Sequence, residues 1–131
     1  MISTKGRYAV RVMIDLAEHA GEGNIPLKDV ADRQEISKKY LEIIVKELVK
    51  GGLVSGTSGK GGGYRLCREP GEYTVGEILE LMEGTLAPVA CLTPGWPECP
   101  RAGICKTLPM WSEYDGMVRG FFYGKKLSDL L

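Results

Sequence analysis

The chain has 131 residues, enough for one domain with an appendage and for a core that needs no disulfides. Its composition, 44% hydrophobic and 26% charged, is that of an ordinary folded protein. No apolar run approaches the roughly 18 residues of a membrane helix, and residues 1–5 lack the apolar stretch of a secretion signal. We therefore expect a cytoplasmic protein with no membrane partner, whose four cysteines are thiols or metal ligands.

The 17 basic and 17 acidic side chains are unevenly distributed. Residues 33–68 carry eight basic and three acidic side chains, whereas residues 71–131 carry five basic and eight acidic ones. The balanced total therefore conceals a basic central segment. Such a segment is either a solvated surface or a binding site for a polyanion.

The first half of the sequence predicts three helices and a hairpin. Ser3 or Thr4 can cap a first helix, a short helix fits residues 27–34, and Ser37 caps a third helix that runs to Lys50. Two short segments, residues 53–55 and 64–67, then flank a glycine-rich turn, which is typical of a β-hairpin. We expect Cys67 to pack within this hairpin.

In the second half, Thr74 and Glu77 match the capping box that starts a helix. Residues 88–109 hold five of the seven prolines and three of the four cysteines, and a last helix fits residues 109–123. That helix is too apolar for a lone surface helix, so its stripe belongs either to the core or to the interface of a dimer. The stripe residues taken as the candidate interface are Trp111, Tyr114, Met117, Val118 and Phe121.

This order of elements predicts a mainly α fold with a small β-hairpin wing: a winged helix-turn-helix plus a C-terminal dimerisation helix. Residues 1–72 would be the DNA-binding domain, and residues 73–131 would supply a helix, a cysteine-bearing loop and the dimerisation helix. The third helix would enter the major groove of DNA while the hairpin turn lies beside it. The candidate contacts are Ser37, Lys38, Lys39, Tyr40, Glu42, Ile43 and Lys46 on the helix, with Ser58, Lys60 and Gly61 in the turn.

The sequence also allows interpretations without DNA binding, in which the third helix is a solvent-exposed helix and the hairpin turn is an ordinary turn. The glycine-rich turn is not a nucleotide phosphate loop, because neither Ser nor Thr follows Lys60 and no helix begins there. The sequence also shows no Cys–His dyad or paired-carboxylate site, so we do not expect an enzyme.

Three cysteines of the proline-rich loop, Cys91, Cys99 and Cys105, are separated by seven and five residues. These spacings are wider than those of zinc knuckles. A loop of this length needs something to hold it, and soft thiolates suit an iron–sulfur cluster or zinc. Unliganded thiols are the third interpretation.

Several segments resemble the Rrf (type two) family of transcription regulators, in particular its iron–sulfur-sensing branch. They are TKGRYAV at residues 4–10, SKKYLE at 37–42, GGLV at 51–54, GGGY at 61–64 and VGEI at 75–78. The resemblance covers nearly the whole chain. It implies a homodimer that binds a palindromic double-stranded operator, mainly as a repressor, and carries a 2Fe–2S cluster on Cys91, Cys99 and Cys105, with zinc as the alternative metal. Cluster-assembly machinery becomes a candidate partner.

The sequence departs from the family pattern at two places. Leu108 occupies the position of the histidine that is the fourth cluster ligand, which leaves that ligand open among Glu98, Glu113, Asp115, His19 and an exogenous thiol or water. Ser58 occupies the position of an arginine on the wing, for which Lys60 can substitute. Two rival functions follow: a cluster-free repressor of cysteine or sulfur metabolism controlled by a thiol or a partner, and an iron–sulfur carrier or redox protein.

Overall fold

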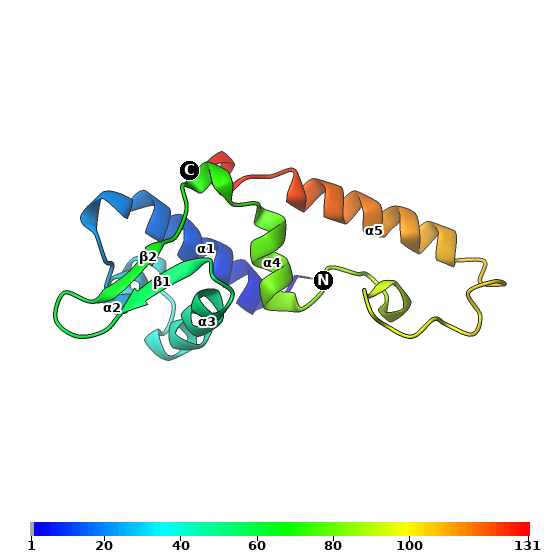
Figure 1. The fold of residues 1–131 in the computed structure, drawn as a ribbon, viewed down its shortest axis with the longest axis horizontal. Coiled ribbons are helices and arrows are strands. Elements are labelled where there is room, and N and C mark those ends of the chain that lie inside the picture. The colour runs from blue at the N-terminus through cyan, green and yellow to red at the C-terminus, as the bar shows by residue number, and fades with distance from the viewer. Residues whose placement is uncertain (1) are drawn as a thin grey trace.

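A computed structural model describes residues 2–131 (Figure 1). It is mostly helical with one two-stranded antiparallel sheet, so the predicted fold class is confirmed. The main elements are α1 (Thr4–Glu18), α2 (Leu27–Gln34), α3 (Lys38–Lys50), β1 (Val54–Thr57), β2 (Gly63–Leu66), α4 (Val75–Glu83) and α5 (Leu108–Tyr123). The 3-10 turns are η1 (Ala20–Glu22), η2 (Pro70–Glu72), η3 (Ala90–Leu92) and η4 (Leu127–Leu130).

The first three helices form a helix-turn-helix unit around one core. Ser3 caps α1 and Ser37 caps α3, each side-chain oxygen accepting a backbone N–H three residues later. Between α2 and α3 the chain turns sharply at Glu35, which adopts a left-handed conformation with φ 53°. The buried apolar faces of α1, α3 and α4 meet in the same core, and burial of this apolar surface is the main force that holds the unit together.

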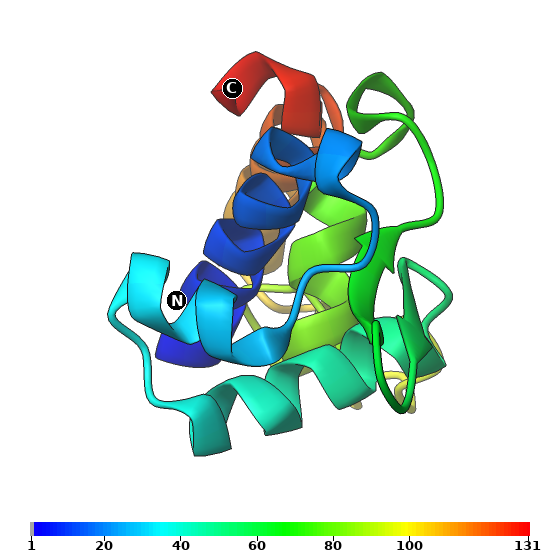
Figure 2. The same cartoon turned by 90° about the vertical axis from the view of Figure 1, so that its left-hand side faces the viewer.

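The hairpin stands beside α3, with Val54 paired to Leu66 and Thr57 paired to Gly63 (Figure 2). β1 ends two residues later than predicted, because Gly56 and Thr57 pair with β2 although their sequence is typical of a turn, and β2 begins and ends one residue earlier than predicted. Gly63 packs closely against Ile25, in the segment that precedes α2, because a Cβ at Gly63 would lie only 2.5 Å from the Ile25 carbonyl oxygen. The expected packing of Cys67 is wrong, since this residue follows β2 and is exposed.

The last helix, α5, is attached to the rest of the molecule mainly at its C-terminal end. Tyr123 lies against Gly76 of α4, where a Cβ would approach the tyrosine ring to 2.5 Å. Beyond α5, the Val75 N–H donates to the Lys125 carbonyl oxygen at 2.8 Å, and Leu127 is buried in the main core. The other end of α5 projects away from the helix-turn-helix unit toward the cysteine loop (Figure 1).

Among the described residues, no helix has both the length and the apolar character needed to cross a bilayer.

Candidate nucleic-acid interface and thiol loop

The face of α3 that points away from the core carries most of the predicted contacts. Leu41, Ile44 and Leu48 are buried, and the opposite face exposes its charged side chains together with Ile43. The exposed candidates on this helix are Ser37, Lys38, Lys39, Glu42, Ile43 and Lys46. Tyr40 differs from them: it is half-buried, and its ring meets Tyr8 of α1 edge-on at 5.8 Å.

The hairpin turn brings the second group of candidates beside this helix. Ser58, Lys60 and Gly61 are exposed at the tip of the wing, between the two strands. A groove of about 490 Å³ separates the wing from α3, and its lining includes Lys46, Ser58 and Tyr64. In Figure 2, α3 runs along the lower edge of the molecule and the wing stands at its right-hand end. The groove therefore places Lys46 of α3 and Ser58 of the turn on adjoining exposed surfaces.

A buried ionic network, which sequence reasoning missed, fixes the turn that leads into α3. Asp15 of α1 is only 1% exposed and accepts hydrogen bonds from Arg33 at 2.8 and 3.0 Å and from Gln34 at 3.0 Å. Arg11 in turn donates to the Gln34 side-chain oxygen at 3.2 Å and to its backbone carbonyl. The end of α2 is thereby held against α1 directly before the chain turns toward α3.

Burial raises the pKa of Asp15, but the hydrogen bonds from Arg33 and Gln34 and the charge of Arg33 outweigh it, so its pKa lies below the usual value. The same network raises the pKa of Arg33 through the hydrogen bond to Asp15. Asp15 therefore stays ionised in the core at neutral pH, as a buried charge with a full set of partners can.

The cysteine loop between α4 and α5 offers suitable donor atoms without a metal-binding arrangement. Cys91 is exposed, and Cys99 and Cys105 are half-buried. Cys105 Sγ lies 3.4 Å from the Thr107 hydroxyl, whose hydrogen bond lowers the pKa of this thiol and so favours the thiolate that metals bind. Within residues 2–131, however, no three His, Cys, Asp or Glu side chains are grouped as metal ligands would be.

Two of the candidates for a fourth ligand, Asp115 and His19, have other partners. Asp115 is engaged by Arg119, one turn further along α5, at 3.2 Å. His19 caps α1, where its Nδ1 lies 2.9 Å from the Asp15 carbonyl oxygen. The thiols fit a soft metal by their chemistry, but the loop conformation described here does not form a cluster site.

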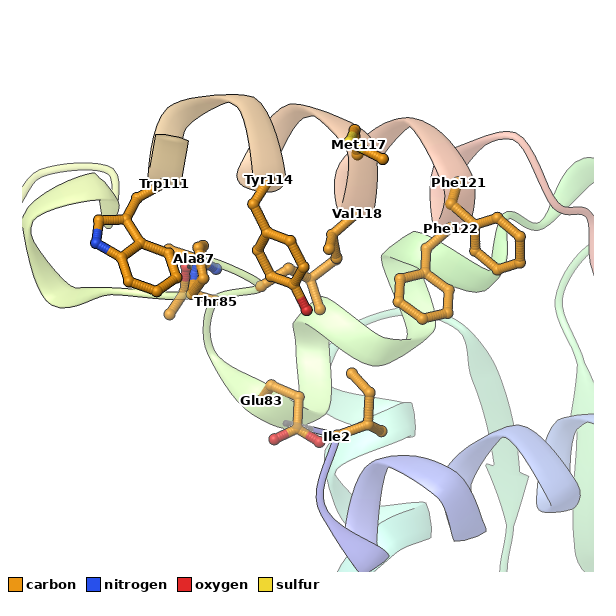
Figure 3. Close-up of a pocket in the computed structure, with 12 residues that line it drawn as sticks. Ile2, Glu83, Thr85, Ala87, Trp111, Tyr114, Met117, Val118, Phe121 and Phe122 are labelled. Carbon is orange, nitrogen blue, oxygen red and sulfur yellow. Dashed lines mark hydrogen bonds between the residues drawn. The ribbon is translucent and has the colours of Figure 1, made fainter. Parts of the chain in front are cut away.

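No residue of α5 is buried in the single chain, and all of its residues are among those that the structure describes. Met117 is 66% exposed, Phe121 59% and Tyr114 52%, so the stripe does not belong to the core of the single chain. Beneath the helix lies a groove of about 760 Å³, into which Tyr114 and Val118 point from one side while Ile2 and Glu83 form the other (Figure 3). Trp111 also lines this groove.

The helix-turn-helix with its adjacent hairpin defines a winged helix-turn-helix protein. A family model described as "Iron-dependent Transcriptional regulator" matches residues 2–131, and the chain belongs to this family, Rrf2. The HTH-type transcriptional regulator IscR of Aliivibrio salmonicida is 38% identical over 130 residues, which cover 99% of this chain and 76% of that protein. This relative is named as a regulator rather than as an enzyme.

Two solved structures are similar over nearly the whole chain. CymR, titled the global cysteine regulator of B. subtilis, has a TM-score of 0.79 at 37% identity, with 99% of this chain and 95% of that chain covered. IscR of T. potens has a TM-score of 0.79 at 35% identity, with 99% and 85% covered. The chain is therefore a transcriptional regulator of the Rrf2 family, similar to members with two different names.

Proposed function

We propose that this regulator binds a duplex operator through α3 and the wing, acting mainly as a repressor. The observation that carries the proposal is the exposed lysine-bearing face of α3, which meets the wing at a groove lined by Lys46 and Ser58, with Lys60 exposed in the same turn. Backbone N–H groups at the Ser37 end of α3 favour phosphate, and Glu42 and Ile43 are placed to contact base edges. Lys39, Lys46 and Lys60 supply positive charge for the DNA backbone.

We propose further that the protein is a homodimer formed through α5. A second copy is the occupant that suits the apolar groove, because the α5 side chains that line it include Met117 and Phe121, which are more than half exposed in the single chain. Two copies would present two α3 helices, as a palindromic operator requires. The interface residues remain those proposed from the sequence: Trp111, Tyr114, Met117, Val118 and Phe121.

Control of DNA binding is assigned to the thiols of the loop, Cys91, Cys99 and Cys105. A 2Fe–2S cluster is the first candidate effector, since three soft thiolates are available on one segment and the chain is similar to proteins named IscR. The binding conformation would differ from the one described, because the thiols are not grouped. Direct thiol chemistry without a cluster is the second candidate, supported by the similarity to CymR and by the lowered pKa of Cys105.

Lysine variants test DNA binding. Lys39→Ala and Lys60→Ala should each weaken binding to a selected duplex and reduce the slope of log affinity against log salt by about one unit. Lys126→Ala is the matched control, because this exposed lysine lies after α5, outside the proposed interface. Salt slopes identical to that of the wild type would remove Lys39 and Lys60 from the interface.

Anaerobic purification tests the cluster. The first candidate predicts a coloured protein that Cys91→Ala, Cys99→Ala and Cys105→Ala each bleach, whereas Cys67→Ala, on the hairpin side of the molecule, stays coloured. Colourless protein with stoichiometric zinc would exclude the cluster and leave the DNA interface standing. Colourless protein without metal would favour the cluster-free thiol regulator.

A further inference from the structure

Tyr73 lies between the wing and α4 and is fully buried. Its hydroxyl donates to the Leu53 carbonyl oxygen at 2.6 Å and accepts the backbone N–H groups of Cys67 at 2.9 Å and Arg68 at 3.0 Å. Leu53 directly precedes β1, and Cys67 and Arg68 directly follow β2. One phenol oxygen therefore joins both strands of the wing at their base.

The tyrosine is itself held firmly by its neighbours. The Arg68 guanidinium lies 4.3 Å from the ring centroid and forms an ion pair with Glu77 at 2.7 Å. Glu77 belongs to the capping box at the start of α4, and the Tyr73 carbonyl oxygen accepts the Leu127 N–H at 3.1 Å. The base of the wing is thus fixed to the start of α4 and to the segment that follows α5.

The wing depends on such support because it consists of only two four-residue strands. A two-stranded hairpin is marginally stable on its own. The pairing of Ile25 with Tyr64 supports β2 but leaves β1 without a backbone partner on its other side within the described chain. The hydroxyl of Tyr73 bonds the residues that flank both strands, so it supplies support at the base of the wing.

We propose that Tyr73 is a positioning residue for DNA binding, which holds the wing where Lys60 can reach the duplex. The inference rests on the proposed function, because it requires that the wing contacts DNA. Tyr73 is buried and does not touch DNA itself. Its effect on DNA binding would be indirect, through the hydrogen bonds of its hydroxyl to the base of the wing. The backbone groups that its hydroxyl contacts, those of Leu53, Cys67 and Arg68, all lie at the base of the wing.

A double-mutant cycle with Tyr73→Phe tests this role, since the change removes only the hydroxyl oxygen. The probe is a duplex fragment selected from a random library by the wild-type protein, titrated at a temperature where melting curves show every variant folded. We expect Lys60→Ala to weaken binding about three- to fivefold in the wild type and less than about twofold in the Tyr73→Phe background. Lys39→Ala, on α3, should cost the same factor in both backgrounds.

Tyr73→Phe alone should also lower the salt slope, as Lys60→Ala does, by up to about one unit. A purely structural role would reduce the melting temperature but leave the cost of Lys60→Ala unchanged between backgrounds, and that result would overturn the inference. Wild-type affinity in Tyr73→Phe would also overturn it, as would a wild-type protein insensitive to Lys60→Ala. If wild-type protein selects no duplex, the proposed function itself fails; if it selects one and the cycle is additive, only the inference fails.

Discussion

Asp15 is the only charged side chain in the core among residues 2–131, and its hydrogen-bond partners are what stabilise it there. The sequence shows an acidic residue in the first helix, but nothing in its spacing indicates that Arg33 and Gln34 lie opposite. Those contacts depend on how α2 crosses α1. Tyr73 is a similar case. Its position before the Thr74 cap, with Ile78 in the same core, is that of a hydrophobic staple. The hydrogen bonds of its hydroxyl have no such local signal in the sequence.

Replacing the buried carboxylate should destabilise the fold. Asp15→Asn places an amide NH2 among the donors of Arg33 and Gln34, so we expect a loss of about 1–3 kcal/mol in the free energy of unfolding at neutral pH, measured by urea denaturation. Asp32→Asn, an exposed carboxyl on the same helix as Arg33, is the control and should change it by less than about 0.5 kcal/mol. Equal losses in the two variants would contradict the importance of the network.

The loss of stability at acid pH should also depend on Asp15. The folded-state pKa of Asp15 lies below its ordinary value of 3.8, so its contribution to stability is complete above that pH and is lost as the pH falls further. The pKa of Glu77 is lowered from 4.5 in the same sense, since the hydrogen bonds and charge of Arg68 outweigh the opposing effect of burial. Unfolding free energy of the wild type should therefore fall below pH 4.5, and that of Asp15→Asn should fall less steeply. Parallel curves would contradict this assignment.

At the scale of elements, the sequence predicts best where local chemistry decides. The helix caps are local signals: Ser37 and Thr74 are each followed by apolar residues at helical spacing. The helices α3 and α4 begin directly after these two residues, as predicted. β1 extends two residues further than predicted because pairing with β2 draws Gly56 and Thr57 into the ladder. The η4 turn, with Leu127 in the core, depends on distant contacts with Tyr73 and has no local signal.

The cap of α4 should contribute measurably to stability. The Thr74 hydroxyl accepts the Glu77 N–H at 3.1 Å and the Glu77 carboxylate accepts the Thr74 N–H at 2.9 Å. We expect Thr74→Ala to cost about 1 kcal/mol in thermal or urea unfolding. Thr107→Ala is the matched control, because the Thr107 side chain at the start of α5 makes no capping hydrogen bond to the described residues. A control that costs as much as Thr74→Ala would contradict this account.

The cysteine loop marks the limit of prediction from the sequence. Its composition indicates three available thiols, and the structure places Cys91, Cys99 and Cys105 on the segment between α4 and α5, as expected. Convergence of the thiols depends on the loop conformation, which has few apolar contacts to fix it. The exposure of the candidate side chains on α3 follows from the spacing of its apolar residues, because the buried face leaves only the opposite one for solvent; their contact with DNA stays a prediction.

For the whole molecule, the exposed stripe of α5 is the feature on which the proposed dimer depends. Met117→Glu places a charge at the most exposed point of the stripe, and we expect the dimer to dissociate into monomers in analytical ultracentrifugation, since an unpaired charge in an apolar interface is costly. Ser112→Glu, exposed on a different side of α5, should remain dimeric. A monomeric wild type would contradict the proposed interface, although α3 and the wing could still bind DNA.

The most direct test of the central claim is a DNA footprint of the wild-type protein on a selected duplex. Two α3 helices related by twofold symmetry should protect two half-sites whose centres lie about one helical turn, or a multiple of it, apart. Lys39→Ala should weaken protection of both half-sites equally. Absence of protection, or uniform coverage of every fragment tested, would contradict the account of this chain as a regulator that recognises its operator through α3 and the wing.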